Sequence, residues 1–347
     1  MMAFKAVDLL GLSLVVDYDT VFKQAGVDVE IAGNFCPLDA SEDQIIAAVG
    51  DGDAAITQAT YQPFTRKVFE SLANLKLVTS VGVGYDKLDV DAATEFGVLA
   101  ANVPDFCLEE VSDHAMALIL TCTRRVCQIN QIVKTRGWKE QPDSFIGSEI
   151  WPRMSKLRGS TLGLVGFGRI PQALVPKARG FGMRIIVYDP FVPPEVFRSF
   201  EVEQVDLDRL LTESDAISVH APYTPETRHL LGLEQLKKMK PTACLVNTAR
   251  GPIVNHEALY TALTEGYIAA AAFDVTEPEP INPDNPLLQL ENFVVTAHSA
   301  HAYSSANPGL TRRAGEEIIK VVKGNWPYGL LNPQVKEKYL QKWGKST

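Results

Sequence analysis

The sequence predicts an α/β protein with two doubly wound parallel sheets, each covered by helices on both faces. Short apolar runs that fit buried strands recur along the chain, and the segments between them leave room for helical crossovers. The length of 347 residues is also sufficient for two domains of ordinary size. Ligands of such sheets bind beyond the carboxyl ends of the strands, so the residues after each run are the candidates for a site.

The first hundred residues alternate strand and helix, which predicts a small parallel sheet. Helical or turn segments are expected at Ser41–Val49 and Thr65–Leu75. The segment Val81–Asp86 directly follows a strand, and its glycines either expose backbone N–H groups to an anion or only make a tight turn. The residues alone favour the tight turn. The expected strands are Phe4–Leu9, Val27–Ile31, Ala54–Ile56, Leu75–Val81 and Val98–Ala100.

After a break at Pro104, the segment Glu109–Val126 carries apolar residues at helical spacing and predicts a helix that leads into a second domain. The following stretch, Lys134–Arg158, contains glycines and prolines and little periodicity. It is expected to be a loop or an irregular arm.

The stretch from Ser160 to Pro190 has the layout of a dinucleotide site. A strand at Thr161–Val165 is followed by a glycine turn, a helix that runs to Gly182, and a strand at Arg184–Tyr188. Gly166 allows the tight turn, and Gly168 lets the backbone of the helix N-terminus approach a pyrophosphate. Asp189, at the end of the second strand, would bind a ribose and repel a 2′-phosphate, which favours NAD over NADP.

Pro171 occupies the third small position of the turn and weakens this match, although proline is tolerated in a first helical turn. The alternative is an ordinary strand, turn and helix of an α/β core.

Beyond Asp189 the alternation resumes, and a six-stranded doubly wound sheet is expected between about residues 108 and 301. Arg250, Glu279 and His298 each follow one of its strands. A permanent cation, an acid and a histidine beside a nicotinamide are the groups needed to reduce a carbonyl next to a carboxylate. Taken singly, each has a structural explanation as a surface charge, a loop acid or a core histidine. The additional strands are expected at Ala216–Val219, Ala243–Val246, Ala271–Phe273 and Phe293–Thr296.

Composition excludes several classes of protein. The chain is 46% hydrophobic and 22% charged, and its net charge of -9 offers no broad basic field for a nucleic acid or an anionic membrane. Its five cysteines show no CxxC spacing, which suits a reducing compartment, and no metal site is expected. The N-terminus lacks a signal-peptide pattern and no stretch approaches the roughly 18 apolar residues of a membrane span, so a cytoplasmic protein is expected.

At this point the chain resembles a known family, the D-isomer-specific 2-hydroxyacid dehydrogenases, over nearly its whole length. The spacing of Arg250, Glu279 and His298 matches the family's catalytic residues and is more specific than the glycine turn. The stretch Pro104–Leu120 and the region after His298 look most like the branch that includes the C-terminal-binding proteins, corepressors that kept the dehydrogenase fold. The other matching segments are Val83–Asp86, the glycine turn, His220–Thr224, Met239–Gly251, Asp274–Pro280 and Thr296–His298.

The resemblance implies a Rossmann NAD domain at 108–301, inserted in a smaller flavodoxin-like substrate domain at 1–107 that is completed by 302–347. It also implies a homodimer and an active site in the cleft between the domains. The activity implied is that of an NAD-dependent D-2-hydroxyacid dehydrogenase, which interconverts a small 2-oxo acid and its D-2-hydroxy acid. An NAD(H)-sensing corepressor-like protein with little turnover is the alternative.

The resemblance also implies residue roles. Arg250 would hold the substrate carboxylate and 2-oxo oxygen, with backbone N–H groups at Val83 and Gly84 on the carboxylate. His298 would be the general acid and base, and Glu279 would favour its charged form, so reduction should lose rate as His298 deprotonates. The residues implied to bind NAD are Gly166, Gly168, Arg169, Ile170, Asp189, Pro222, Thr248 and Asp274, with Asp274 on the nicotinamide carboxamide.

Several positions depart from the family pattern. Besides Pro171, Ala297 replaces a common proline before the catalytic histidine, which could move His298. Ala270 and Thr276 replace a usual glycine and a usual aromatic residue. His301 stands where some relatives place a substrate-contacting aromatic, and either lines the pocket or faces solvent.

The substrate class is inferred from the stretch Thr57–Gln62, which should form part of the substrate pocket and offers hydroxyl and amide groups but no cation. A phosphorylated substrate would call for Arg or Lys there, so 3-phosphoglycerate is disfavoured. Glyoxylate, hydroxypyruvate and pyruvate remain open. A formate or phosphite dehydrogenase is a weaker alternative, because formate enzymes of the family carry Gln at the position of Glu279.

Overall fold

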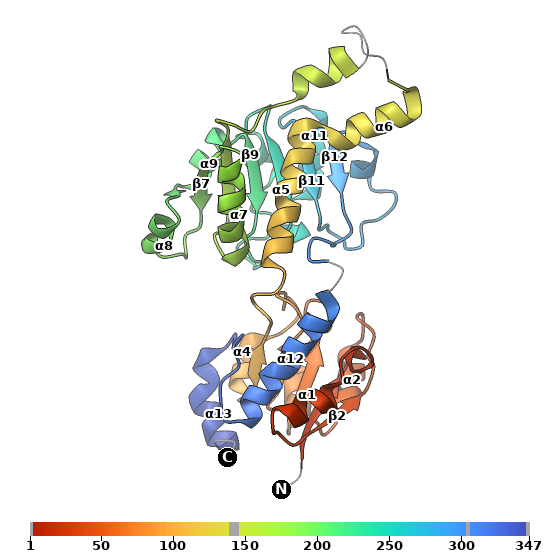
Figure 1. Cartoon of the computed structure of the whole chain (residues 1–347), viewed down its shortest axis with the longest axis vertical. Helices are drawn as coiled ribbons and strands as arrows, with labels where there is room; N and C mark the ends of the chain where they lie inside the picture. The colour runs from red at the N-terminus through yellow and green to blue at the C-terminus, as the bar shows by residue number, and fades with distance from the viewer. Residues whose placement is uncertain (1–2, 139–145, 303–305, 345–347) are drawn as a thin grey trace. The chain divides into compact units, whose positions relative to one another are not determined.

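The computed structural model describes residues 3–138, 146–302 and 306–344, and it divides into two compact units (Figure 1). Unit 1 comprises Met1–Phe106 and Tyr303–Thr347, and unit 2 comprises Cys107–Ala302. The boundaries expected from the sequence differ from these by one residue each.

Unit 1 contains a five-stranded parallel sheet with the strand order β2-β1-β3-β4-β5. This is the order of flavodoxin-like doubly wound sheets. All five expected strands are present, with ends shifted by one or two residues. The strands are β1 (Phe4–Asp8), β2 (Val29–Gly33), β3 (Ala54–Thr57), β4 (Leu77–Ser80) and β5 (Leu99–Ala101).

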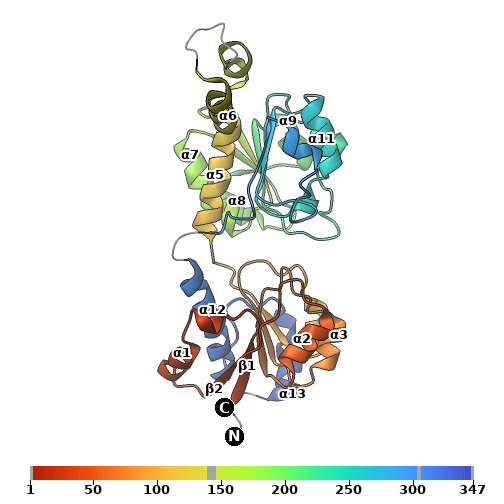
Figure 2. The same ribbon diagram turned by 90° about the vertical axis from the view of Figure 1, so that its right-hand side faces the viewer.

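Two layers of helices cover this sheet, because successive strand residues face opposite sides. Ile45 of α2, Val68 of α3 and Ala92 of α4 belong to the core on one face. Phe22 of α1, Ile318 of α12 and Tyr339 of α13 belong to the core on the other. Figure 2 shows α1 and α12 on one side of this sheet and α2 and α3 on the opposite side. The helices are α1 (Tyr18–Gln24), α2 (Glu42–Val49), α3 (Arg66–Ser71), α4 (Val90–Glu95), α12 (Ala306–Val322) and α13 (Lys336–Trp343), with short turns η1 (Leu12–Leu14) and η6 (Pro333–Val335).

Unit 2 contains a seven-stranded parallel sheet with the order β12-β11-β10-β9-β6-β7-β8. The expected count of six strands is wrong, because β8 consists of two exposed polar residues that pair with β7 and leave no apolar run in the sequence. The order around β6 is that of the Rossmann fold, with the switch point between β6 and β9. The strands are β6 (Thr161–Val165), β7 (Arg184–Tyr188), β8 (Glu203–Gln204), β9 (Ala216–Val219), β10 (Cys244–Asn247), β11 (Ala270–Phe273) and β12 (Phe293–Val295).

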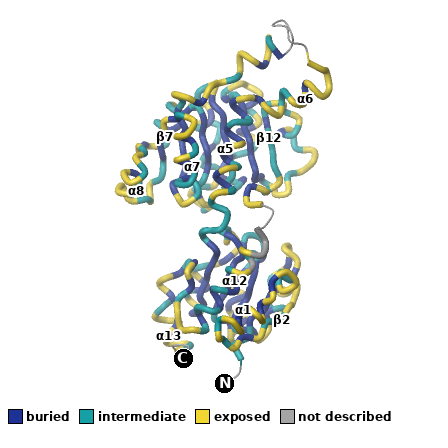
Figure 3. The backbone as a smooth tube through the Cα atoms, viewed as in Figure 1, coloured by how far each residue is buried: buried dark blue, intermediate teal, exposed yellow. Residues whose placement is uncertain are grey.

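Helices also cover both faces of this second sheet, and its inner strands β6, β9, β10 and β11 are buried (Figure 3). Side chains of α5, α7 and α8 build one half of the core, and side chains of α9, α10 and α11 build the other. The helices are α5 (Leu108–Arg124), α6 (Val126–Arg136), α7 (Arg169–Gly180), α8 (Pro194–Ser199), α9 (Leu207–Glu213), α10 (Leu233–Leu236) and α11 (His256–Thr264), with short turns η2 (Ile146–Ile150), η3 (Trp151–Arg153), η4 (Gly251–Ile253) and η5 (Pro286–Gln289).

The helix expected at Glu109–Val126 is interrupted. Arg125 adopts a left-handed conformation with φ of 54°, and its buried guanidinium donates from Nη1 to the Ala269 carbonyl at 3.1 Å. This contact fixes a break between α5 and α6, and α6 continues to Arg136 inside the stretch expected to be irregular. Two short helical turns follow at Ile146–Arg153, and residues 139–145 of that stretch lie outside the described residues.

Among the residues that the structure describes, no helix combines the length and apolar character needed to cross a membrane.

Candidate active site

The glycine turn after β6 requires Gly166 for steric reasons. Its φ is 92°, and a Cβ atom there would lie 2.7 Å from the backbone nitrogen of Ala221, which follows β9. The Gly166 N–H donates to the Tyr188 carbonyl at 2.9 Å. The turn is therefore packed against both neighbouring strands, and any side chain at this position would separate them.

Gly168 has a different role, because a Cβ atom there would meet nothing within 4 Å. It is the N-cap of α7, and no side chain caps that helix. Within the described part of the chain, the N–H groups of Gly168 and Ile170 donate no hydrogen bond. Pro171 is buried in the first turn and the helix forms around it, since its missing N–H would have had no intrahelical partner. Open space and unpaired donors at a helix start suit a phosphate group.

Asp189 lies beside this turn and is held by it. Its Oδ2 accepts from the Phe167 N–H at 2.8 Å, and its Oδ1 accepts from the N–H groups of Phe191 and Val192 at 2.9 and 3.2 Å. The half-buried carboxylate is therefore fixed at the carboxyl end of β7, where it can still receive further hydrogen bonds.

The structure brings Glu279 and His298 together. Nδ1 of His298 lies 2.5 Å from Oε1 of Glu279, and both side chains are about 70% buried. His298 has a left-handed φ of 51°, and its N–H donates to the Asp274 carbonyl at 2.8 Å. This backbone bond fixes His298 although Ala297 precedes it.

Asp274 organises the turn that carries His298. Its carboxylate, 1% exposed, accepts from the N–H groups of Ser299 at 3.0 Å and Ala300 at 2.9 Å and from the Thr296 hydroxyl. Burial alone would raise the pKa of Asp274, but the hydrogen bonds from Thr296, Ala300 and Ser299 and the nearby His114 outweigh it and lower the pKa.

His114 and Thr296 are site residues that the sequence analysis missed. His114 of α5 reaches the Thr296 hydroxyl with Nε2 at 3.1 Å and lies 3.7 Å from Oδ1 of Asp274. For His114 the sequence did contain a signal. It lies three residues after Val111, and this spacing places both residues on the same face of the predicted helix, the face that is buried.

Arg250 follows β10 in a turn shaped by Asn247. The buried Asn247 amide accepts from the Ala249 N–H at 3.0 Å and donates to the Arg250 carbonyl at 2.9 Å. Gly251 comes next, and a Cβ atom there would lie 2.1 Å from the carbonyl of Thr276. The loop of Arg250 is thereby packed directly against the loop that carries Glu279.

The remaining predicted residues of unit 2 are placed as follows. Pro222 is exposed and its carbonyl accepts from the Thr227 hydroxyl at 2.7 Å. The Thr248 hydroxyl is buried and has no hydrogen-bond partner in the described part of the chain. His220 interacts with the Ser218 hydroxyl at 2.8 Å, and burial lowers the pKa of His220 to about 3, so this histidine is neutral at pH 7. His301 is exposed. Its ring is edge-to-face with the ring of His298, and the two ring centroids are 6.1 Å apart.

In unit 1, the loop after β4 carries Val83 and Gly84. Their N–H groups donate no hydrogen bond within the described residues. The loop is braced from behind, because Asn102 donates to the Val83 carbonyl at 2.7 Å and Ser80 donates to the Gly84 carbonyl at 2.9 Å. Two successive unpaired donors in a braced loop suit a carboxylate.

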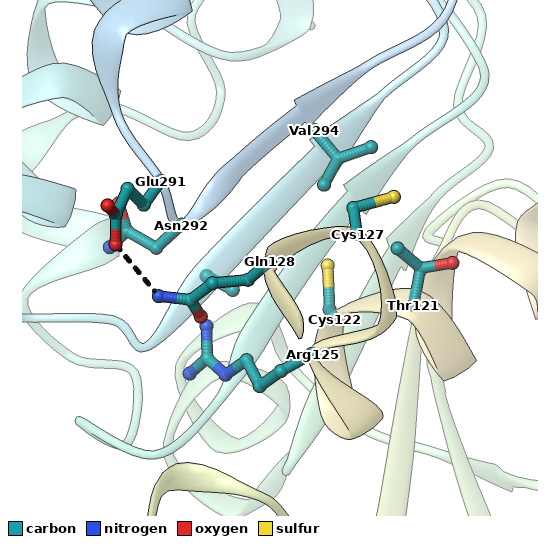
Figure 4. Close-up of a pocket in the computed structure, with 9 residues that line it drawn as sticks. Thr121, Cys122, Arg125, Cys127, Gln128, Glu291, Asn292 and Val294 are labelled. Atoms are coloured by element: carbon teal, nitrogen blue, oxygen red, sulfur yellow. Dashed lines mark hydrogen bonds between the residues drawn. The ribbon is translucent and has the colours of Figure 1, made fainter. Parts of the chain in front are cut away.

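Two cavities flank the sheet of unit 2. A cavity of about 340 Å³ is lined by α5 and the turn after His298, including His114, Ser299 and Ala300, so it adjoins the candidate site. A much smaller one, of about 10 Å³, lies near the start of β11 and β12 beside Cys122 and Arg125 (Figure 4). The second cavity has room for about one water molecule and sits at the amino ends of the strands, away from the candidate site.

No cluster of side chains able to hold a metal ion occurs within residues 3–138, 146–302 and 306–344. The open Gly168 turn, the fixed Asp189 carboxylate and the orphaned Thr248 hydroxyl together fit a dinucleotide.

Comparison with known proteins agrees with this geometry. The sequence profile described as the NAD binding domain of D-isomer specific 2-hydroxyacid dehydrogenases matches residues 116–300. A glyoxylate reductase of Korarchaeum cryptofilum is 41% identical over 297 residues, which cover 85% of this chain and 87% of that protein. A D-3-phosphoglycerate dehydrogenase of Methanocaldococcus jannaschii is 38% identical over 304 residues, covering 87% of this chain and 56% of that protein.

Among solved structures, the PH0520 protein of Pyrococcus horikoshii superposes with a TM-score of 0.83 at 27% identity, covering 97% of both chains. The chain therefore belongs to the D-isomer-specific 2-hydroxyacid dehydrogenase family. It is an NAD-dependent D-2-hydroxyacid dehydrogenase. The finer expectation of a place beside the C-terminal-binding proteins stays a prediction.

Proposed function

We propose that this chain reduces a small 2-oxo acid to its D-2-hydroxy acid with His298 as the general acid, and catalyses the reverse reaction with His298 as the base. The observation that carries the proposal is the 2.5 Å contact between His298 Nδ1 and Glu279 Oε1. A carboxylate on one ring nitrogen orients the imidazole and favours its protonated form, as a proton donor requires.

The role of each side chain in the reaction follows from this contact. Bound NADH supplies the hydride that reduces the 2-oxo carbon. Because Nδ1 of His298 faces Glu279, Nε2 on the other side of the ring gives its proton to the substrate oxygen as the C–O bond becomes a single bond. In the reverse direction Nε2 takes the hydroxyl proton. Glu279 keeps its charge throughout and stabilises the imidazolium.

Arg250 is the proposed anchor of the substrate carboxylate and 2-oxo oxygen, because a planar guanidinium matches a carboxylate with two parallel hydrogen bonds. Its loop is held against the Glu279 loop by the close packing of Gly251 on Thr276. In unit 1, the N–H groups of Val83 and Gly84, which donate no hydrogen bond among the described residues, are the proposed carboxylate donors.

The proposed cofactor contacts follow the geometry of unit 2. The start of α7, with Gly168, Arg169 and Ile170, would bind the pyrophosphate, and Asp189 would bind the adenosine ribose. Pro222 and Thr248 would line the rest of the NAD site. Asp274 would accept a hydrogen bond from the nicotinamide carboxamide, on an oxygen lone pair that its hydrogen bonds within the protein leave available.

The proposed substrates are glyoxylate, hydroxypyruvate and pyruvate. The stretch Thr57–Gln62 contains no cation for a phosphate, and several of the relatives are named glyoxylate reductases. The relatives named D-3-phosphoglycerate dehydrogenases make 3-phosphohydroxypyruvate the necessary comparison. A homodimer is part of the same proposal and rests on the family resemblance alone. A location in the cytoplasm stays an expectation from the cysteine pattern of the sequence.

The test is NADH oxidation by the purified chain with each of these four acids, alongside His298→Gln. Turnover of the small acids in preference to the phosphorylated one, lost in His298→Gln while NADH still binds, supports the proposal. Faster turnover of the phosphorylated acid would refute the substrate class, and full activity in His298→Gln would refute the proton donor.

A further inference from the structure

A second carboxylate, Glu277, lies two residues before Glu279 on the same loop and is held by two cationic or polar partners. Its Oε1 receives a hydrogen bond from Arg228 Nη1 at 2.8 Å, and its Oε2 lies 3.2 Å from His229 Nε2. The Glu277 side chain is about 70% buried. Burial would raise the pKa of Glu277, but the hydrogen bonds from His229 and Arg228 outweigh it and lower the pKa.

The hydrogen bonds around His229 fix its tautomer. Asn255 is the N-cap of α11, and its Oδ1 accepts from the Ala258 N–H at 2.8 Å, so its Nδ2 must face His229. An amide nitrogen only donates, and therefore Nδ1 of His229, 3.3 Å away, is the acceptor. A neutral His229 then carries its proton on Nε2 and donates it to Glu277. A continuous series of directed hydrogen bonds therefore runs from Asn255, at the start of α11, through His229 to Glu277.

The segment that carries Arg228 and His229 is itself attached to the loop of Arg250. The His229 N–H donates to the Pro252 carbonyl at 2.8 Å, and the Leu231 N–H donates to the Ile253 carbonyl at 3.1 Å. The partners of Glu277 therefore belong to the same structural unit as the proposed substrate anchor.

The far side of the loop is closed by Thr276. Its hydroxyl donates to the Pro278 carbonyl at 2.8 Å, and its N–H donates to Oε2 of Glu279 at 3.3 Å, while Oε1 of Glu279 contacts His298. Since Thr276 also packs on Gly251, a displacement of Glu277 moves the backbone that positions Glu279.

We propose that Glu277, clamped by Arg228 and His229, is a positioning residue that holds Glu279 against the ring of His298, the proposed general acid. This proposal rests on the proposed function for its catalytic meaning. Arg228 also offsets the charge of Glu277, so that a second carboxylate does not compete with Glu279. The charged and titratable groups that the structure places beside this assembly are Arg228, His229 and His256 around Glu277, Tyr223 beside Arg228, and Glu279 and His301 around His298.

The experiment compares Glu277→Gln with the wild type by two readouts. The first is the titration of the His298 ring followed by NMR on histidine-labelled protein, with His298→Gln to assign the signal; it requires no turnover. The second is the pH dependence of kcat and KM for reduction. Glu203→Gln is the matched control, because Glu203 is likewise held by two side-chain donors, Arg184 and Arg209, at the opposite edge of the sheet.

The proposal predicts that Glu277→Gln moves the His298 titration to lower pH by about half a unit or more, because the imidazolium is less well paired. It also predicts a kcat about 10-fold lower with KM for the 2-oxo acid nearly unchanged. Arg228→Ala should shift the His298 titration in the same direction. Arg228→Lys, which keeps the charge and one donor, should shift it less.

An unchanged His298 titration in a folded Glu277→Gln protein would overturn the proposal, as would an equal shift in Glu203→Gln. If Glu277→Gln does not fold, Arg228→Ala is measured in its place, and the same outcomes apply. A shifted titration in a chain that reduces no 2-oxo acid would support the positioning role and refute the proposed function, so the two failures are distinguishable.

Discussion

Oε1 of Glu279 lies 2.5 Å from Nδ1 of His298, and the same carboxylate accepts from the Thr276 N–H through its other oxygen. Glu279→Gln keeps an acceptor at this position but removes the charge that favours imidazolium. We expect kcat for reduction to fall about 10²-fold. The alkaline limb of the pH profile should move to lower pH, because the proton donor is lost earlier as pH rises. Steady-state kinetics across pH measures both effects, and an unmoved alkaline limb would contradict the role of Glu279.

The glycine turn offers a matched pair of variants. Gly166→Ala places a Cβ atom 2.7 Å from the Ala221 nitrogen at a φ of 92°, so we expect a loss of about 3 kcal/mol or more in unfolding free energy. Gly168→Ala meets nothing within 4 Å and should cost less than about 1 kcal/mol. Urea denaturation of the two proteins measures the difference.

The same pair tests the cofactor site. Because the new methyl group of Gly168→Ala occupies the space proposed for a phosphate, its Kd for NADH should rise about 10-fold or more although its fold is intact. Fluorescence titration with NADH measures this affinity. Wild-type affinity in Gly168→Ala would place the pyrophosphate elsewhere.

Cofactor preference should depend on Asp189. Asp189→Asn keeps an acceptor for the Phe167 N–H but removes the charge that would repel a 2′-phosphate. We expect the ratio of kcat/KM for NADH over NADPH to fall about 10-fold or more, mostly through a lower KM for NADPH. A ratio that does not change would show that the ribose lies away from this carboxylate.

Asp274 should make stability depend on pH. Its pKa is lowered in the folded chain, so it stabilises the fold above its unfolded value of about 4, and this contribution is lost as pH falls through the folded value. Asp274→Asn should therefore be about 1 to 3 kcal/mol less stable than the wild type between pH 5 and 8. The difference should shrink below about pH 4. Urea denaturation at several pH values checks this, and a constant difference down to pH 3 would contradict it.

Most of the fold was predictable because buried strands leave apolar runs and glycine turns leave spaced glycines. The exceptions lack such signals. β8 is two polar residues, Glu203 and Gln204, that pair only because β7 lies beside them. The break at Arg125 depends on a contact with Ala269, far away in the sequence.

The candidate site likewise contains some residues that the sequence predicts and others that it does not. Arg250, Glu279 and His298 could be found because each follows a strand, and strand ends meet at one edge of a sheet. The partners of Glu277 could not, because Arg228 and His229 approach it through hydrogen bonds between segments about fifty residues apart. The contact of His114 with Thr296 likewise needs the packing of α5 against β11.

The most direct test of the central claim is NADH oxidation with glyoxylate, hydroxypyruvate and pyruvate by the wild type and by His298→Gln, with NADH affinity measured for both. The account predicts turnover of at least one acid by the wild type, and a kcat lower by about 10² to 10⁴ in the variant at unchanged NADH affinity. Tight NADH binding by a wild type that reduces none of these acids, or equal turnover in the variant, would contradict it.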